Sequence, residues 1–265
     1  MAHDTKDYFS DGVAYERFMG RWSRAAGAIF LDWVAPPSGA RWLDIGCGTG
    51  VFTELVLDTC SPATVVAVDP AAAQIELARN KPFAQRADFR VADAQTLPFP
   101  DGAFDVVASA LVINFISDRP RALAEMRRVC NPGGVVAGYV WDFQAERGVV
   151  SPIRAGLIQI GSKPPPMPGT EDSRLEALSS LFAGGNLKDI ATRTIDVTMS
   201  FPEFNEFWRV HTPPSNSPMG KMIAALSETD REKLIESVRA RLPAGPDGSI
   251  THSARANAIK ARVPE

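Results

Sequence analysis

The chain has 265 residues, of which 45% are hydrophobic and 22% are charged, and its formal net charge is -3. This composition is typical of a globular protein with a substantial core, and the acidic balance disfavours a nucleic-acid surface, which needs a concentrated basic face. The polar opening MAHDTKDYFS lacks a signal-peptide pattern and no apolar run could cross a bilayer, so we expect a cytoplasmic protein that does not bind membranes.

The first half of the chain alternates between helical and extended patterns. Aromatic and aliphatic residues spaced from Tyr15 to Trp33 predict N-terminal helices, which the segment APPSG at 35–39 ends. Short apolar runs predict strands at 42–45, 64–68, 89–92, 104–108 and 135–140. Helical spacing predicts helices between them at 51–57, 71–79 and 120–130. Strands that alternate with helices form right-handed βαβ units, so we expect a largely parallel sheet.

The second half has a different pattern, which begins with a proline-rich loop at 161–169. Residues 190–199 and 250–263 predict two later strands that could pair antiparallel at one sheet edge. The aromatic and then helical segment 201–242 predicts a lid over the carboxyl edge of the sheet. We therefore expect an α/β fold: a Rossmann-like, doubly wound, mostly parallel sheet with an antiparallel edge strand, N-terminal helices and a C-terminal helical lid insertion.

A glycine-rich segment, LDIGCGTG at 43–50, lies between a predicted strand and a predicted helix. Its three glycines let the backbone approach a ligand at points where any Cβ would collide. The helix that follows offers free N–H groups and a positive dipole end to that ligand. The alternative is a tight strand-to-helix turn that binds nothing.

Two aspartates follow the next two predicted strands. Asp69, in VDP at 68–70, lies at the spacing at which an acidic residue accepts hydrogen bonds from ribose hydroxyls. Asp93, followed by Ala94, could accept from the exocyclic amine of an adenine while the next backbone N–H meets a ring nitrogen. Each has a simpler interpretation, Asp69 as a helix N-cap and Asp93 as a turn residue. After the glycine segment, the pair favours a bound adenosine.

In this order the motifs resemble those of the class I S-adenosylmethionine-dependent methyltransferases, in particular the branch called methyltransferase type 11. The similarity runs from about Tyr15 to Asp142. Its segments are LDIGCGTG at 43–50, VDP at 68–70, VADAQTLPFPDGAFDVV at 91–107 and EMRRVCNPGGVVAGYVWD at 125–142. The resemblance implies S-adenosyl-L-methionine as methyl donor, S-adenosyl-L-homocysteine as product, and no metal.

The resemblance also implies a cofactor site, residue by residue. The residues against the amino-acid end of the cofactor would be Gly46, Cys47, Gly48 and Gly50. The ribose would bind Asp69, and the adenine would lie near Pro70, Gln74, Asp93 and Ala94. Ala108 and Ser109 would lie under the sulfonium. From the N-terminal helices, Tyr15 and Arg24 would close over the cofactor, with Arg24 either a partner of the methionine carboxylate or a solvated helix charge.

The sequence departs from the family pattern in two places. Many relatives carry His-His or His-Trp soon after the fourth strand, where this chain has Val112, Ile113 and Asn114. This departure puts any borrowed acceptor chemistry in doubt. Gln74 stands where methionine or leucine is common, which should only alter the adenine pocket.

The acceptor side has no assigned catalytic residue. We expect a small-molecule methyl acceptor, whose pocket the second half of the chain would form. The candidates on that side are Asn114, Trp141, Asp142, Trp208 and His211. His211 could act as a base only if the acceptor must lose a proton, and a single loop histidine is usually unremarkable. Phe204, Phe207 and Trp208 are more typical of a lid core than of a substrate site.

Other interpretations stay open. An NAD(P)-dependent oxidoreductase would need GxGxxG in place of the GxGxG found here, and it would have no use for Asp93. A nucleic-acid or protein methyltransferase is disfavoured by the acidic balance and by the lack of an Asp/Asn-Pro-Pro-Tyr tetrapeptide. A quinone- or lipid-type acceptor, or a non-catalytic protein that binds adenosyl ligands, also fits. The sequence does not decide the oligomeric state or whether carbon, oxygen or nitrogen is methylated.

The cysteines and the domain plan complete these expectations. Cys47, Cys60 and Cys130 form no CxxC or Cys/His pattern, which predicts free thiols in a reducing compartment and no metal site. We expect one methyltransferase domain over 1–265. Its parts would be an N-terminal helical cap at 1–38, a cofactor-binding core at 39–145, and sheet completion with a substrate lid at 146–265.

Overall fold

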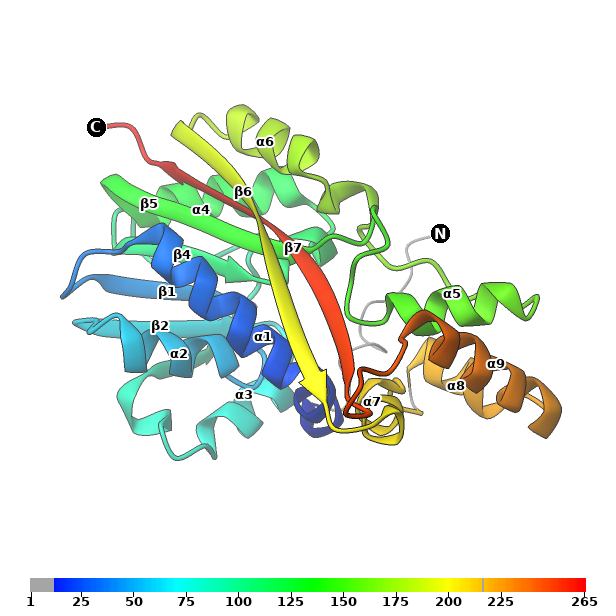
Figure 1. Cartoon of the computed structure of the whole chain (residues 1–265). Helices are drawn as coiled ribbons and strands as arrows, with labels where there is room; N and C mark the ends of the chain where they lie inside the picture. Colours follow the sequence, from blue (N-terminus) through cyan, green and yellow to red (C-terminus); the bar gives the residue numbers. More distant parts are fainter. Residues whose placement is uncertain (1–11, 216) are drawn as a thin grey trace.

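A computed structural model describes residues 12–215 and 217–265, with side chains described from Met19 onward. Within this part of the chain a seven-stranded sheet has the order β3-β2-β1-β4-β5-β7-β6 (Figure 1). Its strands are β1 (Arg41–Ile45), β2 (Thr64–Asp69), β3 (Asp88–Val91), β4 (Phe104–Ala110), β5 (Cys130–Trp141), β6 (Lys188–Phe201) and β7 (Ile250–Arg262).

The direction of the strands matches the predicted fold class. The pairs among β1 to β5 are all parallel, whereas β7 runs antiparallel to both β5 and β6. The antiparallel strand therefore lies just inside the edge strand β6, and the mostly parallel sheet with an antiparallel edge is confirmed.

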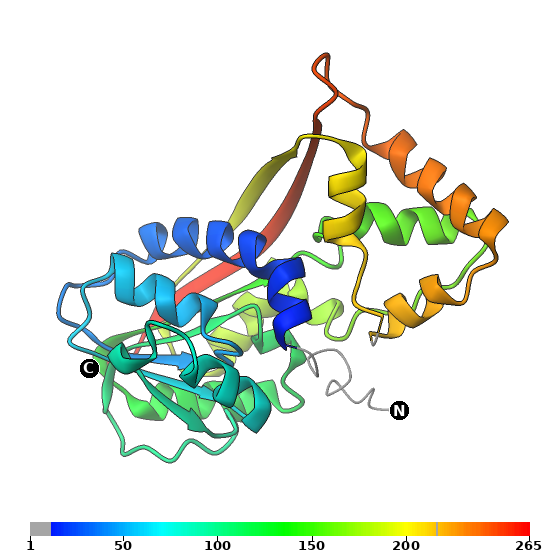
Figure 2. The same cartoon turned by 90° about the horizontal axis from the view of Figure 1, so that it is seen from below.

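Helices cover both faces of the sheet (Figures 1 and 2). On one face lie α1 (Gly12–Val34), α2 (Val51–Thr59) and α3 (Ala72–Arg79). On the other lie α4 (Arg119–Val129) and α6 (Leu175–Gly184). Each face has its own apolar core, because buried strand side chains alternate between the two faces.

Helix α4 illustrates how local sequence determines an element. The Asp118 side chain accepts a hydrogen bond of 3.0 Å from the Arg121 amide, which caps the helix where the sequence predicted its start. Leu123, Met126 and Val129 are fully buried, as their helical spacing predicted. The helix therefore packs its apolar face on the sheet.

A group of four helices, called the cap from here on and distinct from the segment 1–38, lies beyond the carboxyl ends of β4 and β5, at the right in Figures 1 and 2. It consists of α5 (Ser151–Gln159), α7 (Phe204–His211), α8 (Pro218–Ala224) and α9 (Glu228–Arg241). The last pair of the β5–β7 ladder is Trp141 with Ala256, but β6 and β7 stay paired as far as Phe201 and Ile250. These two long strands thus carry α7 to α9, inserted between them, past the end of the sheet.

A cluster of buried rings anchors the cap to α1. Trp22 of α1 donates a hydrogen bond of 3.0 Å from Nε1 to Nε2 of His211 in α7. Because an indole N–H can only donate, the proton of the neutral imidazole resides on Nδ1, which donates to the Phe207 carbonyl at 2.9 Å. The Phe207 ring stacks on His211 with centroids 4.1 Å apart. Both ring nitrogens of His211 are therefore occupied.

Burial lowers the pKa of His211 to about 4, and it also lowers the pKa of the neighbouring His252. His252 donates from Nε2 to the Val149 carbonyl at 3.1 Å, and its ring centroid lies 5.9 Å from that of His211. The folded protein therefore binds protons at these rings less readily than the unfolded chain does.

We expect the free energy of unfolding to fall as pH drops from 6.5 towards 4. A histidine whose pKa is depressed by folding contributes its full stability above the unfolded pKa, near 6.5, and loses it as pH falls towards the folded value. For His211 the loss is on the order of 3 kcal/mol. Urea unfolding at several pH values measures this loss.

The matched variant is His211→Gln, whose amide can still accept from Trp22 but does not titrate. Its stability should depend less steeply on pH between 6.5 and 4, with the remaining slope due to His252 and the carboxylates. Equal slopes for the variant and the wild type would show that His211 is not the responsible group.

Candidate functional site

The glycine-rich loop after β1 is held against β2. The amides of Gly46 and Cys47 both donate to the Val68 carbonyl, at 2.8 and 3.0 Å. Gly46 has a φ of +73°, and a Cβ there would lie 2.5 Å from the Val112 side chain. Gly48 has a φ of +54°, and a Cβ there would meet nothing within 4 Å. The loop is thus closed on the Gly46 side and open at Gly48.

The N-terminus of α2 follows this loop directly. Gly50 is the N-cap residue, with a left-handed φ of +87°, and no side chain caps the helix. The amides of the first turn lack intrahelical partners, as at any helix start, and they point beyond the end of the helix. An anionic group of a ligand could bind there.

Asp69 ends β2 and ties the loop to the start of α3. Its Oδ2 accepts from the Gly48 amide at 3.0 Å, and its Oδ1 accepts from the Ala71 amide at 2.9 Å. Burial raises the pKa of Asp69, and these two backbone hydrogen bonds oppose the rise. Each carboxylate oxygen keeps a lone pair for a further donor, so the carboxylate can hold the loop and also accept from ligand hydroxyls.

The segment after β3 reaches the same edge of the sheet. The Ala92 amide donates to the Asp69 carbonyl at 3.2 Å, so the following turn begins beside the end of β2. Asp93 is exposed, and its Oδ1 accepts from the Gln95 amide at 2.8 Å. Ala94 is buried in the turn. Asp93 therefore lies in a turn, which is the simpler of its two interpretations, and its contact with an adenine stays a prediction.

The remaining cofactor candidates are spread around this edge. Gln74 is buried in α3, and Pro70 is exposed between β2 and α3. Arg24 of α1 forms an ion pair with Glu54 in the first turn of α2. The side chain of Tyr15 lies outside the described residues.

Asp44 is a site residue that sequence reasoning did not single out. Its side chain is fully buried in β1, and Oδ2 accepts from the Thr53 hydroxyl at 2.6 Å. Within the described part of the chain Oδ1 has no partner, and burial raises the pKa of Asp44 to about 7. The available signal was an acid among the buried apolar residues of the strand RWLDI, two positions before the first glycine.

The carboxyl end of β4 lies next to the glycine loop. Ala108 and Ser109 are fully buried, and Ser109 pairs with Ile45, the last residue of β1. Within the described part of the molecule the Ser109 hydroxyl has no hydrogen-bond partner. Buried polar atoms without partners are rare, so those of Asp44 and Ser109 on adjacent strands call for an explanation.

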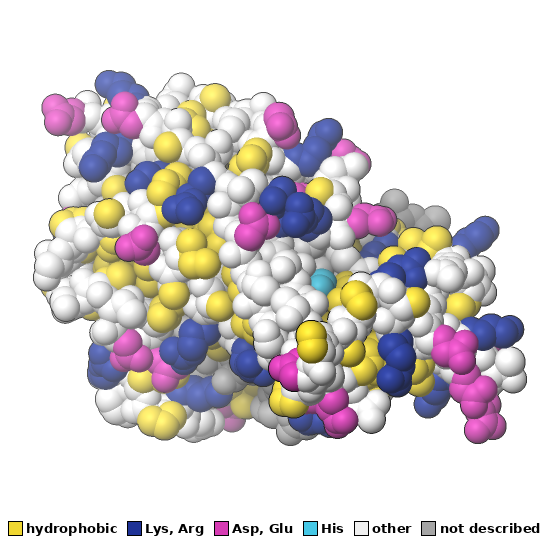
Figure 3. All heavy atoms as spheres, in the orientation of Figure 1, with side chains coloured by type: hydrophobic (Ala, Val, Ile, Leu, Met, Phe, Trp, Pro, Cys, Tyr) yellow, Lys and Arg dark blue, Asp and Glu magenta, His cyan; other side chains and the backbone are white. Residues whose placement is uncertain are grey.

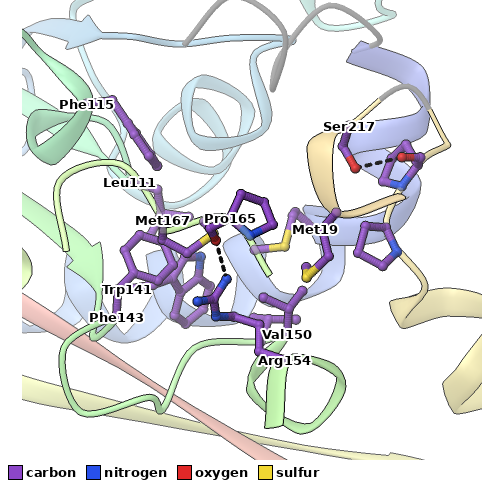
Figure 4. A pocket seen from close by; sticks show the side chains of 14 residues that line it. Met19, Leu111, Phe115, Trp141, Phe143, Val150, Arg154, Pro165, Met167 and Ser217 are labelled. Carbon is purple, nitrogen blue, oxygen red and sulfur yellow. Dashed lines mark hydrogen bonds between the residues drawn. The ribbon is translucent and has the colours of Figure 1, made fainter. Parts of the chain in front are cut away.

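An apolar cavity lies between this edge and the cap (Figure 4). Leu111, directly after β4, and Trp141, the last residue of β5, line it from the sheet. Met19 and Met219 line it from α1 and α8. Leu111 has a φ of +64°, a conformation that is strained for a branched residue, and its neighbour is the Val112 that covers Gly46. Two consecutive residues thus connect the cavity to the glycine loop.

Of the candidate acceptor residues, Trp141 lines this cavity and the others have structural contacts. Asn114 donates from Nδ2 to the Pro168 carbonyl at 3.4 Å, and Asp142 accepts from the Ala145 amide at 3.1 Å. Trp208 stacks on Phe204 within the cap, as expected of a lid core. His211 belongs to the ring cluster that joins α7 to α1. With both nitrogens occupied and a pKa near 4, it is unsuited to act as a base.

No group of three or more histidine, cysteine, aspartate or glutamate side chains among the described residues could hold a metal ion. None of the helices that the structure describes is long and apolar enough to span a membrane.

Part of the chain is similar to known methyltransferases. Residues 43–138 match the family model described as a methyltransferase domain. A malonyl-[acyl-carrier protein] O-methyltransferase of Serratia marcescens is 34% identical over 51% of this chain and 54% of its own length. A demethylmenaquinone methyltransferase of Thermus thermophilus is 40% identical over 43% of this chain and 51% of its own length. The chain thus spans about half the length of these curated relatives.

A solved structure extends the likeness of fold to nearly the whole chain. Phosphoethanolamine N-methyltransferase 2 of Haemonchus contortus, in complex with S-adenosyl-L-methionine, matches with a TM-score of 0.60 and 19% identity. The match covers 98% of this chain and 58% of that one. Residues 43–138 are therefore similar to a methyltransferase domain, and nearly the whole chain shares the fold of a solved methyltransferase.

Proposed function

We propose that the chain binds S-adenosyl-L-methionine and transfers its methyl group to a small, largely apolar acceptor. The observation that carries this proposal is the Asp69 carboxylate bonded to the Gly48 amide beside a glycine loop that is open at Gly48. The apolar cavity begins next to this loop, at Leu111. A donor site and an acceptor site are therefore adjacent at one edge of the sheet.

The residues at this edge fit the cofactor chemically. Gly48 leaves open space where the backbone could contact a ligand, and the uncapped start of α2 suits its carboxylate. Asp69 would accept from the ribose hydroxyls, and the segment at Asp93 and Ala94 would receive the adenine. The partnerless carboxyl oxygen of Asp44, buried next to the loop, is consistent with a site that binds a cationic group.

The cofactor supplies a methyl group already activated on a sulfonium, which an acceptor attacks by in-line displacement. The chain must then align the acceptor and exclude competing water. Alignment alone can contribute roughly 7–11 kcal/mol in favourable intramolecular reactions. We assign that role to the cavity walls, Leu111 and Trp141 from the sheet and Met219 from the cap, which exclude water with apolar surface.

The apolar lining also favours a quinone- or lipid-type acceptor as a second candidate. The Thermus thermophilus relative is named for demethylmenaquinone. Nucleic acid is a poorer candidate: on the face seen in Figure 3, basic and acidic side chains are interspersed and form no continuous basic stripe. A non-catalytic role would predict binding of the cofactor without turnover in the presence of any acceptor.

Calorimetric titration with S-adenosyl-L-methionine, S-adenosyl-L-homocysteine and NADH tests the donor site. We expect saturable binding of the two adenosyl sulfur compounds and none of NADH. Asp69→Asn should raise the dissociation constant for both roughly ten- to a hundredfold, because it removes a charged acceptor. Asp88→Asn, an exposed carboxyl at the opposite end of a neighbouring strand, is the matched control and should leave binding unchanged. Binding of NADH, or equal affinity in Asp69→Asn, would contradict the proposed site.

A glycine pair tests whether the loop contacts the ligand. Gly48→Ala and Gly39→Ala both place a Cβ at positive φ, +54° and +76°, with nothing within 4 Å. Their backbone strain should therefore be similar, about 1–2 kcal/mol. Only Gly48→Ala should weaken cofactor binding, by about tenfold or more, because its Cβ enters the ligand space. Equal affinities in the two variants, measured by the same titration, would remove Gly48 from the site.

A further inference from the structure

The apolar cavity contains one charged side chain among its described lining residues, Arg154 of α5. Figure 4 shows its guanidinium among Trp141, Val150 and Met167, with Nη1 donating to the Pro165 carbonyl at 2.6 Å. This bond uses one of the five N–H donors of the group. No carboxylate of the described residues forms an ion pair with Arg154.

A second, polar hollow adjoins the cavity and shares part of its lining. The shared residues are Phe143, Val150, Arg154 and Met167. The other side of this hollow carries the carboxyl groups of Glu146, Glu171 and Asp172. Arg154 therefore lies at the boundary between the apolar cavity and a polar hollow that carboxyl groups line.

Two of these three carboxylates have cationic partners of their own. Asp172 pairs with Arg119 at 2.9 Å, and Glu171 pairs with Arg174 at 3.3 Å. Among the described residues, the charge of Arg154 thus has no direct counter-ion, whereas Asp172 and Glu171 are paired. Next to apolar walls such a charge interacts strongly with an anion, because the local dielectric constant is lower than in water.

We propose that Arg154 selects the ligand of this cavity: a mostly apolar molecule that bears a single acidic oxygen group, such as a carboxylate or a phenolate. The apolar body of the ligand fits the apolar cavity, and its acidic group pairs with the Arg154 guanidinium at the boundary of that cavity. The adjoining polar hollow disfavours a ligand with several negative charges, because arginines of the described residues pair with only two of its three carboxylates. The identification of this ligand with the methyl acceptor rests on the proposed function. The preference of the cavity for one anionic group is independent of it.

Two fluorescent probes on one scaffold test the preference without the acceptor. 8-Anilino-1-naphthalenesulfonate carries one negative charge, and N-phenyl-1-naphthylamine is the same apolar body without it. Titrations would compare the wild type with Arg154→Gln, Arg154→Lys, Met167→Trp and the control Arg231→Gln, an exposed arginine of α9. Thermal unfolding of each variant checks that it folds.

We expect both probes to bind the wild type and Arg231→Gln. Arg154→Gln should weaken the sulfonate probe by about tenfold or more and leave the neutral probe unchanged, with partial rescue in Arg154→Lys. Met167→Trp, which fills the cavity, should weaken both probes. If Arg154 only tethers the loop at Pro165, both probes should weaken together in Arg154→Gln, which would overturn the proposal.

Two further outcomes would also overturn it: equal binding of the sulfonate probe in Arg154→Gln and the wild type, or no binding of either probe to the wild type. Calorimetry with S-adenosyl-L-methionine on the same proteins reports the proposed function separately. Probe selectivity without cofactor binding would refute methyl transfer and leave the anion preference intact. Cofactor binding without probe selectivity would refute the anion preference and leave the proposed methyl transfer intact.

Discussion

The hydrogen bond from the Gly48 amide to the Asp69 carboxylate joins the ends of two neighbouring strands, and the rest of the site depends on it. Together with the bonds of Gly46 and Cys47 to the Val68 carbonyl, it holds a loop whose glycines would otherwise be free to adopt many conformations. A loop that is ordered before a ligand arrives loses little entropy on binding. The carboxylate thus acts first on the protein's own backbone, and its remaining lone pairs are free for a ligand.

The same edge of the sheet also shapes the apolar cavity. Leu111 and Val112 follow β4, one lining the cavity and the other covering Gly46, so any movement of this turn would affect both places. The strained φ of Leu111 is maintained in part by a hydrogen bond of 2.7 Å from its amide to the Tyr139 carbonyl of β5. A parallel sheet brings the carboxyl ends of its strands to one edge, which is why the glycine loop and the apolar cavity are neighbours in this fold.

The cap completes the cavity, and its position depends on a few buried contacts with the core. Trp22 and His211 join α1 to α7, while β6 and β7 carry the cap helices outward. Because the His211 ring is buried and neutral, this attachment is stable at neutral pH and weakens in acid. The pocket that would receive an acceptor is therefore built from elements far apart in the sequence. Its walls are mostly apolar, and α5 adds the charged side chain of Arg154.

The sequence alone predicted the strands, the main helices of the first half, the glycine loop and the acids at Asp69 and Asp93, because each depends on local patterns of a few residues. It did not predict α5 or α6. It also did not indicate that one carboxyl oxygen of Asp44 has no partner among the described residues, or that Arg154 lines the cavity. It also left His211 open as a base, whereas the structure places that ring in contact with Trp22, 189 positions earlier. Burial and pairing of this kind arise only when distant segments pack together. The backbone of the proposed donor site was therefore predictable from local sequence, whereas the apolar cavity was decided by tertiary structure.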